Sequence, residues 1–144
     1  MNSMMQTRYF ALLMGILFVL AGVGGFVPLV TAPMSPDAPA LSIEMSYGYL
    51  LGLFPINVIH NLVHLSFGIW GLVAYRSYPQ ARLYCRSLAL ILAVFAIMGL
   101  FAQTYAMFGL MPLFGHDIWL HALEAVVAGY LGYFARSEAQ IASA

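Results

Sequence analysis

Four long apolar stretches, almost free of charge, constrain this chain more than any other feature of its sequence. They run over residues 9–30, 50–75, 87–110 and 118–135. A helix that crosses a bilayer needs about 20 mostly apolar residues. Apolar runs without period-2 alternation exclude the strands of a membrane β-barrel. The sequence therefore predicts an all-α fold, an integral membrane four-helix bundle in which residues 1–144 form a single transmembrane domain.

The composition excludes several classes of protein. Of the 144 residues, 63% are hydrophobic and only 7% are charged, whereas a soluble domain is about 25% charged. The formal net charge of zero gives no electrostatic attraction to a nucleic acid, so we expect none as a partner. The single cysteine, Cys85, excludes a disulfide within the chain and a cysteine-based metal site. We expect the lipid bilayer to surround this protein.

The arginines predict the orientation in the membrane. All five lie at one side of the predicted helices: Arg8, Arg76, Arg82, Arg86 and Arg136. The two remaining connections, on the other side, contain acidic residues but no basic one. Because basic residues are retained on the cytoplasmic side, we expect a multi-pass protein with both termini in the cytoplasm.

Polar residues inside the apolar stretches are few, and they share helical faces. Such residues are costly in lipid and usually face the interior of a bundle. The second stretch places four of them on one helical face: Asn57, His60, Asn61 and His64. The fourth helix places three on one face: Asp117, His121 and Glu124. The third stretch adds Gln103 at a similar depth. We expect a polar pocket between the second and fourth helices, in the outer half of the membrane.

Histidine spacing makes a metal site the sharpest interpretation of this pocket. His60 and His64 are four residues apart, and His121 and Glu124 are three apart, so each pair can reach one ion from one helix. We predict a divalent metal (zinc, iron or copper) bound by His60, His64, His121 and Glu124. Asn57, Asn61, Gln103 and Asp117 would support it, with Asn57 accepting from a ring N–H. Three alternatives stay open: haem or chlorophyll held by the same histidines, hydrogen bonds between helices with no ligand, and proton transfer between Glu124 and a histidine.

Small residues predict how the helices meet, because they allow close approach in membranes. Gly68 and Gly71 would touch Ala128 and Gly132, which brings the second and fourth helices together.

On the first helix, Gly15 and Gly22 share one face and predict contact with other membrane chains or a second copy. An alternative function is therefore an accessory subunit of a larger photosynthetic or respiratory membrane complex. No nucleotide-binding loop or serine nucleophile motif is present, so we expect no enzymatic activity.

Two motifs carry a resemblance to a known family. Residues 52–65 read GLFPINVIHNLVHL and are followed by Gly68 and Gly71; later, Asp117 precedes Leu120 and His121. These motifs resemble a family of small four-helix bacterial membrane proteins known only as a domain of unknown function. The resemblance implies this fold and a bacterial origin, and it assigns no activity. We expect the protein in a bacterial inner or thylakoid membrane. The motif residues present here are Asn57, His60, Asn61, His64, Asp117 and His121, whereas Glu124 lies outside the motif.

Overall fold

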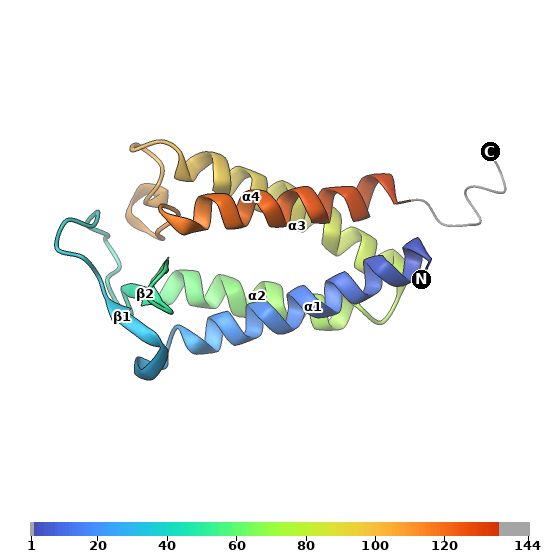
Figure 1. Cartoon of the computed structure of the whole chain (residues 1–144), viewed down its shortest axis with the longest axis horizontal. Helices are drawn as coiled ribbons and strands as arrows, with labels where there is room; N and C mark the ends of the chain where they lie inside the picture. Colours follow the sequence, from blue (N-terminus) through green and yellow to red (C-terminus); the bar gives the residue numbers. More distant parts are fainter. Residues whose placement is uncertain (1, 136–144) are drawn as a thin grey trace.

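The computed structural model describes residues 2–135, and helices make up 64% of these described residues. The described residues contain four α-helices: α1 (Ser3–Gly24), α2 (Val58–Ala74), α3 (Tyr78–Gly99) and α4 (His116–Gly129). Figure 1 shows α1 beside α2 and α3 beside α4, all running along the long axis. The start of α1 and the end of α4 lie at one end of the molecule, and the two long connections lie at the other (Figure 1).

A small antiparallel sheet corrects the expectation of an all-α chain. It consists of β1 (Thr31–Pro33), β2 (Gly48–Leu50) and β3 (Phe54–Ile56), in that order. Thr31 pairs with Leu50, and Gly48 pairs with Ile56. The tight connection from β2 to β3 contains Gly52 at φ 70°, a conformation that glycine adopts without steric cost. The sheet closes the end of the molecule beside the predicted polar pocket.

The second helix begins later than the expected residue 50. Pro55 lies inside β3, and a proline disfavours helical backbone in the residue before it. Asn57 then caps α2 with its side chain, which accepts a hydrogen bond from the backbone N–H of His60. Residues 50–57 therefore contribute to the sheet and to the cap of α2, and the helix itself ends at Ala74.

The third helix is displaced toward the N-terminus relative to the expected range 87–110. It begins at Tyr78, with Pro79 in its first turn, where a proline loses no helical hydrogen bond. It ends at Gly99, and the carbonyl of Leu113 occupies the place where a side chain on Gly99 would stand. Residues 100–115 form turns and a short 3₁₀ segment, η2 (Met107–Gly109), which fold back over the helix ends.

Glycines of α1 and α2 allow these two helices to pack closely against each other, which corrects two expectations. A Cβ atom on Gly68 would lie 2.7 Å from the backbone nitrogen of Val19, and one on Gly71 would lie 2.8 Å from the carbonyl of Ala11. A Cβ atom on Gly15 would lie 2.7 Å from the nitrogen of Leu72. The glycines of α2 therefore do not meet α4. Gly15 makes its close approach within the chain, so it gives no indication of another subunit.

The fourth helix continues into a π-helical turn, η3 (Tyr130–Phe134), and packs on α3. The carbonyl oxygen of Gly132 accepts from Nε of Arg82 at 2.9 Å and from Nε of Arg86 at 2.8 Å. A π-turn leaves a carbonyl outside the regular helical ladder, which explains why two side chains can bond it. Arg136, used above to predict orientation, lies outside the described residues.

The apolar core extends from the arginine end of the molecule as far as Phe18, which adjoins the polar cluster. The core draws on all four helices; its members include Met14, Phe18, Ala74, Tyr84, Leu88, Leu92, Ala128 and Leu131. Two helices, α1 and α3, are long and apolar enough to cross a membrane, each with 22 residues. This agrees with the coarse prediction of a membrane protein, while α2 is shorter, with 17 residues.

Candidate metal centre

Three imidazole rings converge between α2 and α4. His60, His64 and His121 each offer one nitrogen atom, and these atoms all lie within 4.8 Å of one another. The ring centroids of His60 and His64 are 4.4 Å apart, and those of His60 and His121 are 6.1 Å apart. His60 and His121 are each only a few per cent exposed. The structure thus brings together the three histidines that the spacing singled out.

The cap of α2 fixes where two of these rings lie. The Asn57 side chain holds the N–H of His60 at 3.0 Å, which sets the start of the helix. His64 follows one turn later, so its ring stands beside that of His60. A shift of the helix start by one residue would rotate both rings by about 100° and separate them from His121.

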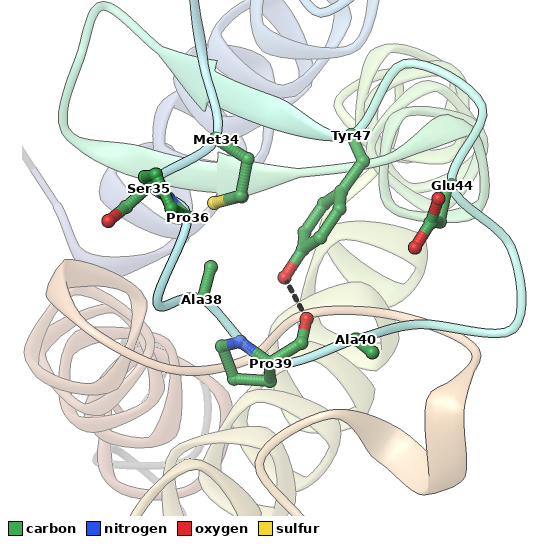
Figure 2. Close-up of a pocket in the computed structure, with 8 residues that line it drawn as sticks. All are labelled: Met34, Ser35, Pro36, Ala38, Pro39, Ala40, Glu44 and Tyr47. Atoms are coloured by element: carbon green, nitrogen blue, oxygen red, sulfur yellow. Dashed lines mark hydrogen bonds between the residues drawn. The ribbon is translucent and has the colours of Figure 1, made fainter.

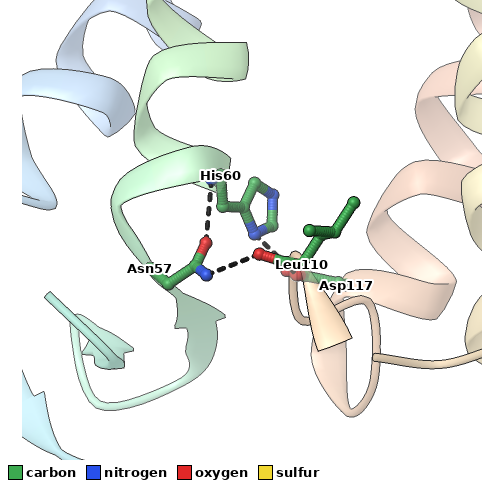
Figure 3. A network of polar contacts seen from close by, with 4 residues as sticks. All are labelled: Asn57, His60, Leu110 and Asp117. Carbon is green, nitrogen blue, oxygen red and sulfur yellow. Dashed lines mark hydrogen bonds and ion pairs between the residues drawn. The ribbon is translucent and has the colours of Figure 1, made fainter. Parts of the chain in front are cut away.

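Asn57 has a different role from the one expected. Its Nδ2 donates to the carbonyl of Ile43 at 2.9 Å and to the carbonyl of Leu110 at 2.7 Å, and its Oδ1 accepts from His60 N–H. Figure 3 shows Asn57 between the start of α2 and the backbone at Leu110. Because the cap and both loop contacts occupy its amide, Asn57 does not orient an imidazole ring; it joins the two long loops to α2.

Asp117 is the carboxylate nearest to a histidine of the cluster. It lies in the first turn of α4 and is buried, with Oδ2 3.7 Å from Nδ1 of His60 (Figure 3). This separation exceeds that of a hydrogen bond. Asp117 therefore lies beside the His60 ring without a hydrogen bond to it.

Three other predicted residues lie differently around the cluster. Glu124 is not part of the group of converging ligand atoms; it lines a neighbouring cavity. Asn61 is fully buried, and its amide packs against Gly25 at the end of α1. Gln103 is exposed on the turns after α3, because that helix ends at Gly99. Gln103 thus does not reach the pocket edge that its predicted helical position would have given it.

Aromatic rings from α1 and α3 enclose the histidines, a contribution that sequence reasoning missed. Phe18 stacks on His64, with ring centroids 5.5 Å apart and planes inclined by 19°. Phe95 packs on His121 with centroids 5.8 Å apart. Phenylalanines are abundant in this chain, so no sequence signal distinguishes these two from ordinary packing residues.

Several buried polar atoms of the cluster have no hydrogen-bond partner among the described residues. They are Nδ1 of His60, Nδ1 of His64, Nδ1 of His121, Oδ2 of Asp117 and Oε2 of Glu124. Leaving one such atom unsatisfied costs about 1–3 kcal/mol. Natural interiors rarely tolerate several of these atoms at one place, which makes the cluster a candidate for binding an ion or a polar ligand.

A large cavity opens beside the cluster, between α1 and α4. Its volume is about 610 Å³, within the range of small-molecule sites. Leucine and valine side chains of α1 line one wall, and the connection from β2 to β3 closes the outer end. His64, Asp117, His121 and Glu124 line the opposite side. The same polar residues thus face both the histidine cluster and an apolar space.

A second cavity lies within the long loop after α1 and carries no comparable chemistry. Figure 2 shows Tyr47 pointing across it toward Pro39, whose carbonyl accepts from the tyrosine hydroxyl at 2.6 Å. Burial raises the pKa of Tyr47 to about 12, with further contributions from Tyr49, Tyr105 and Glu44. The hydroxyl therefore stays protonated and holds the loop closed. Among the described residues, Glu44 is the only charged one that lines this cavity.

The fourth histidine, His116, stands apart from the cluster. It is exposed at the start of α4, and its Nδ1 accepts from Nε1 of Trp119 at 2.9 Å. It offers a natural control for experiments on the other three.

Comparison with known protein families identifies one match for this chain. A family model described as a domain of unknown function (DUF4383) matches residues 8–134. The matched range contains all the residues of the cluster and both walls of the neighbouring cavity. This match confirms the resemblance to a family of unknown function that the sequence indicated. No curated protein and no solved structure matches the chain.

Proposed function

We propose, on the premise that the chain belongs to the DUF4383 family of domains of unknown function, that it is a multi-pass membrane protein that binds a divalent metal ion. The ligands are His60, His64 and His121. The observation that carries the proposal is the convergence of one nitrogen from each of these residues within 4.8 Å.

The distances suit an ion after a small adjustment. Nitrogen ligands about 2.0–2.1 Å from a tetrahedral zinc ion lie about 3.3 Å from one another. The nitrogens lie within 4.8 Å of one another, so we expect the three side chains to rotate inward when an ion binds. Imidazole ligands suit zinc, copper, iron and nickel. Three protein ligands leave a fourth position free, as in the open class of zinc sites.

The third histidine favours an ion over a tetrapyrrole. Haem takes one or two axial ligands and needs a flat space between or beside them. Suppose that two of the nitrogens bound the iron from opposite faces of the macrocycle. The third nitrogen lies within 4.8 Å of both, so its ring would clash with the macrocycle. The cluster therefore supports a single bare ion better than haem or chlorophyll.

The exterior of the helices supports placement in a membrane. Large apolar side chains are exposed along the length of the helices, among them Leu13 at 53%, Leu90 at 61% and Val126 at 71%. In water such a surface would promote aggregation, whereas in lipid it is the natural exterior. We therefore propose that all four helices cross the bilayer as a bundle, in a bacterial inner or thylakoid membrane.

The charges support one orientation for this bundle. Arg8, Arg76, Arg82 and Arg86 lie at the end where α1 starts and α2 joins α3. Asp37, Glu44 and Asp117 belong to the opposite end. The positive-inside rule then places the termini in the cytoplasm and the histidine cluster in the outer half of the membrane.

Metal analysis of the purified protein tests the metal site. The protein is prepared in detergent without a histidine tag, stripped with a chelator, and reloaded with Zn²⁺ or Co²⁺. We expect about one ion per chain by elemental analysis, and visible absorption from bound Co²⁺. The variant His64→Ala should lose the ion, and His116→Ala should keep it.

Two outcomes would overturn this proposal. One is the absence of a stoichiometric ion in wild-type protein whose circular dichroism shows native helix content. The other is equal metal content in wild type and His64→Ala. A Soret band in the protein as isolated would instead assign the histidines to haem.

A further inference from the structure

The cavity between α1 and α4 has two chemically different walls. Leu17, Leu20 and Val23 of α1 make one wall apolar. His64, His121 and Glu124 make the other wall polar. A cavity of this kind suits a molecule with an apolar tail and a polar head.

The polar wall contains both donors and acceptors without partners. Nδ1 of His64 and Nδ1 of His121 are buried and unpaired among the described residues, as are carboxylate oxygens of Asp117 and Glu124. An imidazole N–H donates to a carbonyl oxygen, and a carboxylate accepts from a hydroxyl group. This wall can therefore satisfy a head group in either its carbonyl or its hydroxyl form.

The charges near the cavity exclude an anionic head group. No arginine or lysine is among the described residues that line it, and Arg8, Arg76, Arg82 and Arg86 belong to the other end of the molecule. A phosphate buried here would meet the carboxyl groups of Asp117 and Glu124 and no cation to neutralise it. The polar wall therefore does not suit a phospholipid head group, but it suits a head group without charge.

We infer that this cavity binds a lipid-soluble quinone or its quinol. The ring would lie against the polar wall, where the histidines donate to its carbonyl oxygens or the carboxylates accept from its hydroxyl groups. The tail would follow the apolar side chains of α1. A volume of about 610 Å³ holds a substituted ring with the first part of a prenyl tail.

This inference shares the membrane placement with the proposed function but does not require the metal ion. His64 and His121 belong to both sites. A bound ion would leave each ring one further nitrogen, which can still donate to a ligand. The two proposals can therefore fail separately.

Photoaffinity labelling with an azido-quinone that carries a decyl tail tests the inference. The purified protein is labelled in detergent, with and without chelator treatment, and the labelled peptides are identified by mass spectrometry. We expect label on residues 17–30 or 117–124. Unlabelled decyl-quinone should compete at a concentration at least about tenfold lower than 1-decanol, because two head-group hydrogen bonds are worth about that factor.

Matched substitutions locate the site. Ala21 lines this cavity, and Ala122 lines a separate apolar groove on α3 and α4. Ala21→Phe should abolish the labelling that decyl-quinone competes, and Ala122→Phe should retain it. Should Ala21→Phe fail to fold by circular dichroism, Leu17→Trp narrows the same cavity from its open side.

The inference is overturned if 1-decanol competes as well as the quinone, because the quinone ring would then contribute nothing beyond an apolar tail that ends in a hydroxyl group. It is overturned equally if Ala21→Phe and Ala122→Phe label alike. Elemental analysis of the same samples reports metal binding independently, so a result on one site does not decide the other.

Discussion

Nδ1 of His60 lies 3.7 Å from Oδ2 of Asp117, across the gap between α2 and α4. The two side chains are buried and come from helices that pair with other helices, α2 with α1 and α4 with α3. This contact places a carboxylate beside one of the three converging imidazoles. It therefore links the proposed metal site to the start of α4.

Asp117→Asn should weaken metal binding without unfolding the protein. A carboxylate that receives the second N–H of a metal-bound histidine increases metal affinity by about 10–100-fold, and the amide would lose that charge. The dissociation constant for Zn²⁺, measured by competition with a chromophoric chelator, should rise by this factor. Asp37→Asn, at a loop acid, is the control. An unchanged dissociation constant in Asp117→Asn would remove Asp117 from the site.

Asn57→Ala should destabilise the protein through two separate losses. The helix cap is worth about 0.5–2 kcal/mol, and each loop carbonyl left without its donor costs about 1–3 kcal/mol. Asn57→Ser keeps a capping oxygen but removes the hydrogen bonds to Ile43 and Leu110. It should therefore recover only the part of the stability that the cap contributes.

Thermal unfolding in detergent, followed by circular dichroism, measures these changes. Asn2→Ala removes the cap of α1 alone and should cost about 0.5–2 kcal/mol. Equal losses in Asn57→Ala and Asn2→Ala would show that the contacts to the two loops contribute nothing.

Gly71→Ala and Gly129→Ala compare one substitution at a tight and at an open position. A Cβ atom on Gly71 would lie 2.8 Å from the carbonyl of Ala11, whereas one on Gly129 would meet Ala89 at an ordinary 3.7 Å. Gly71→Ala should force α1 and α2 apart and cost about 1–3 kcal/mol. Gly129→Ala should be neutral or stabilising, because alanine is the better helix former. Equal melting temperatures would contradict the close packing of α1 on α2.

Cysteine labelling in intact cells tests the orientation. Single cysteines at Ser35, in the loop after α1, and at Ser77, between α2 and α3, should react differently with a maleimide that does not cross membranes. Because the arginine end faces the cytoplasm, Ser35→Cys should be labelled in intact cells and Ser77→Cys only after permeabilisation. The native Cys85 is buried and provides the background. Labelling of both positions in intact cells would contradict the proposed topology.

The candidate site could be predicted from the sequence to the extent that it depends on helical periodicity. His60 and His64 share a face whatever packs against it, and His121 shares a face with Glu124. The partners of Asn57 could not be predicted, because they are backbone carbonyls in two loops 14 and 53 residues away. The same limit applies to Phe18, which reaches His64 only because α1 lies beside α2. Assembly with other chains stays a prediction, without the support of Gly15.

The sequence by itself determined that the chain is mostly helical and apolar, and which polar side chains share a helical face, because these properties follow from composition and local spacing. Only the tertiary structure decided that α1 pairs with α2, that residues 54–56 form a strand, and that α3 ends at Gly99. Those outcomes depend on contacts between segments that are distant in the sequence. A glycine allows close packing only where another backbone segment approaches it, as the carbonyl of Leu113 approaches Gly99. The pocket between α1 and α4 exists because the helices that carry its two walls pair with different neighbours.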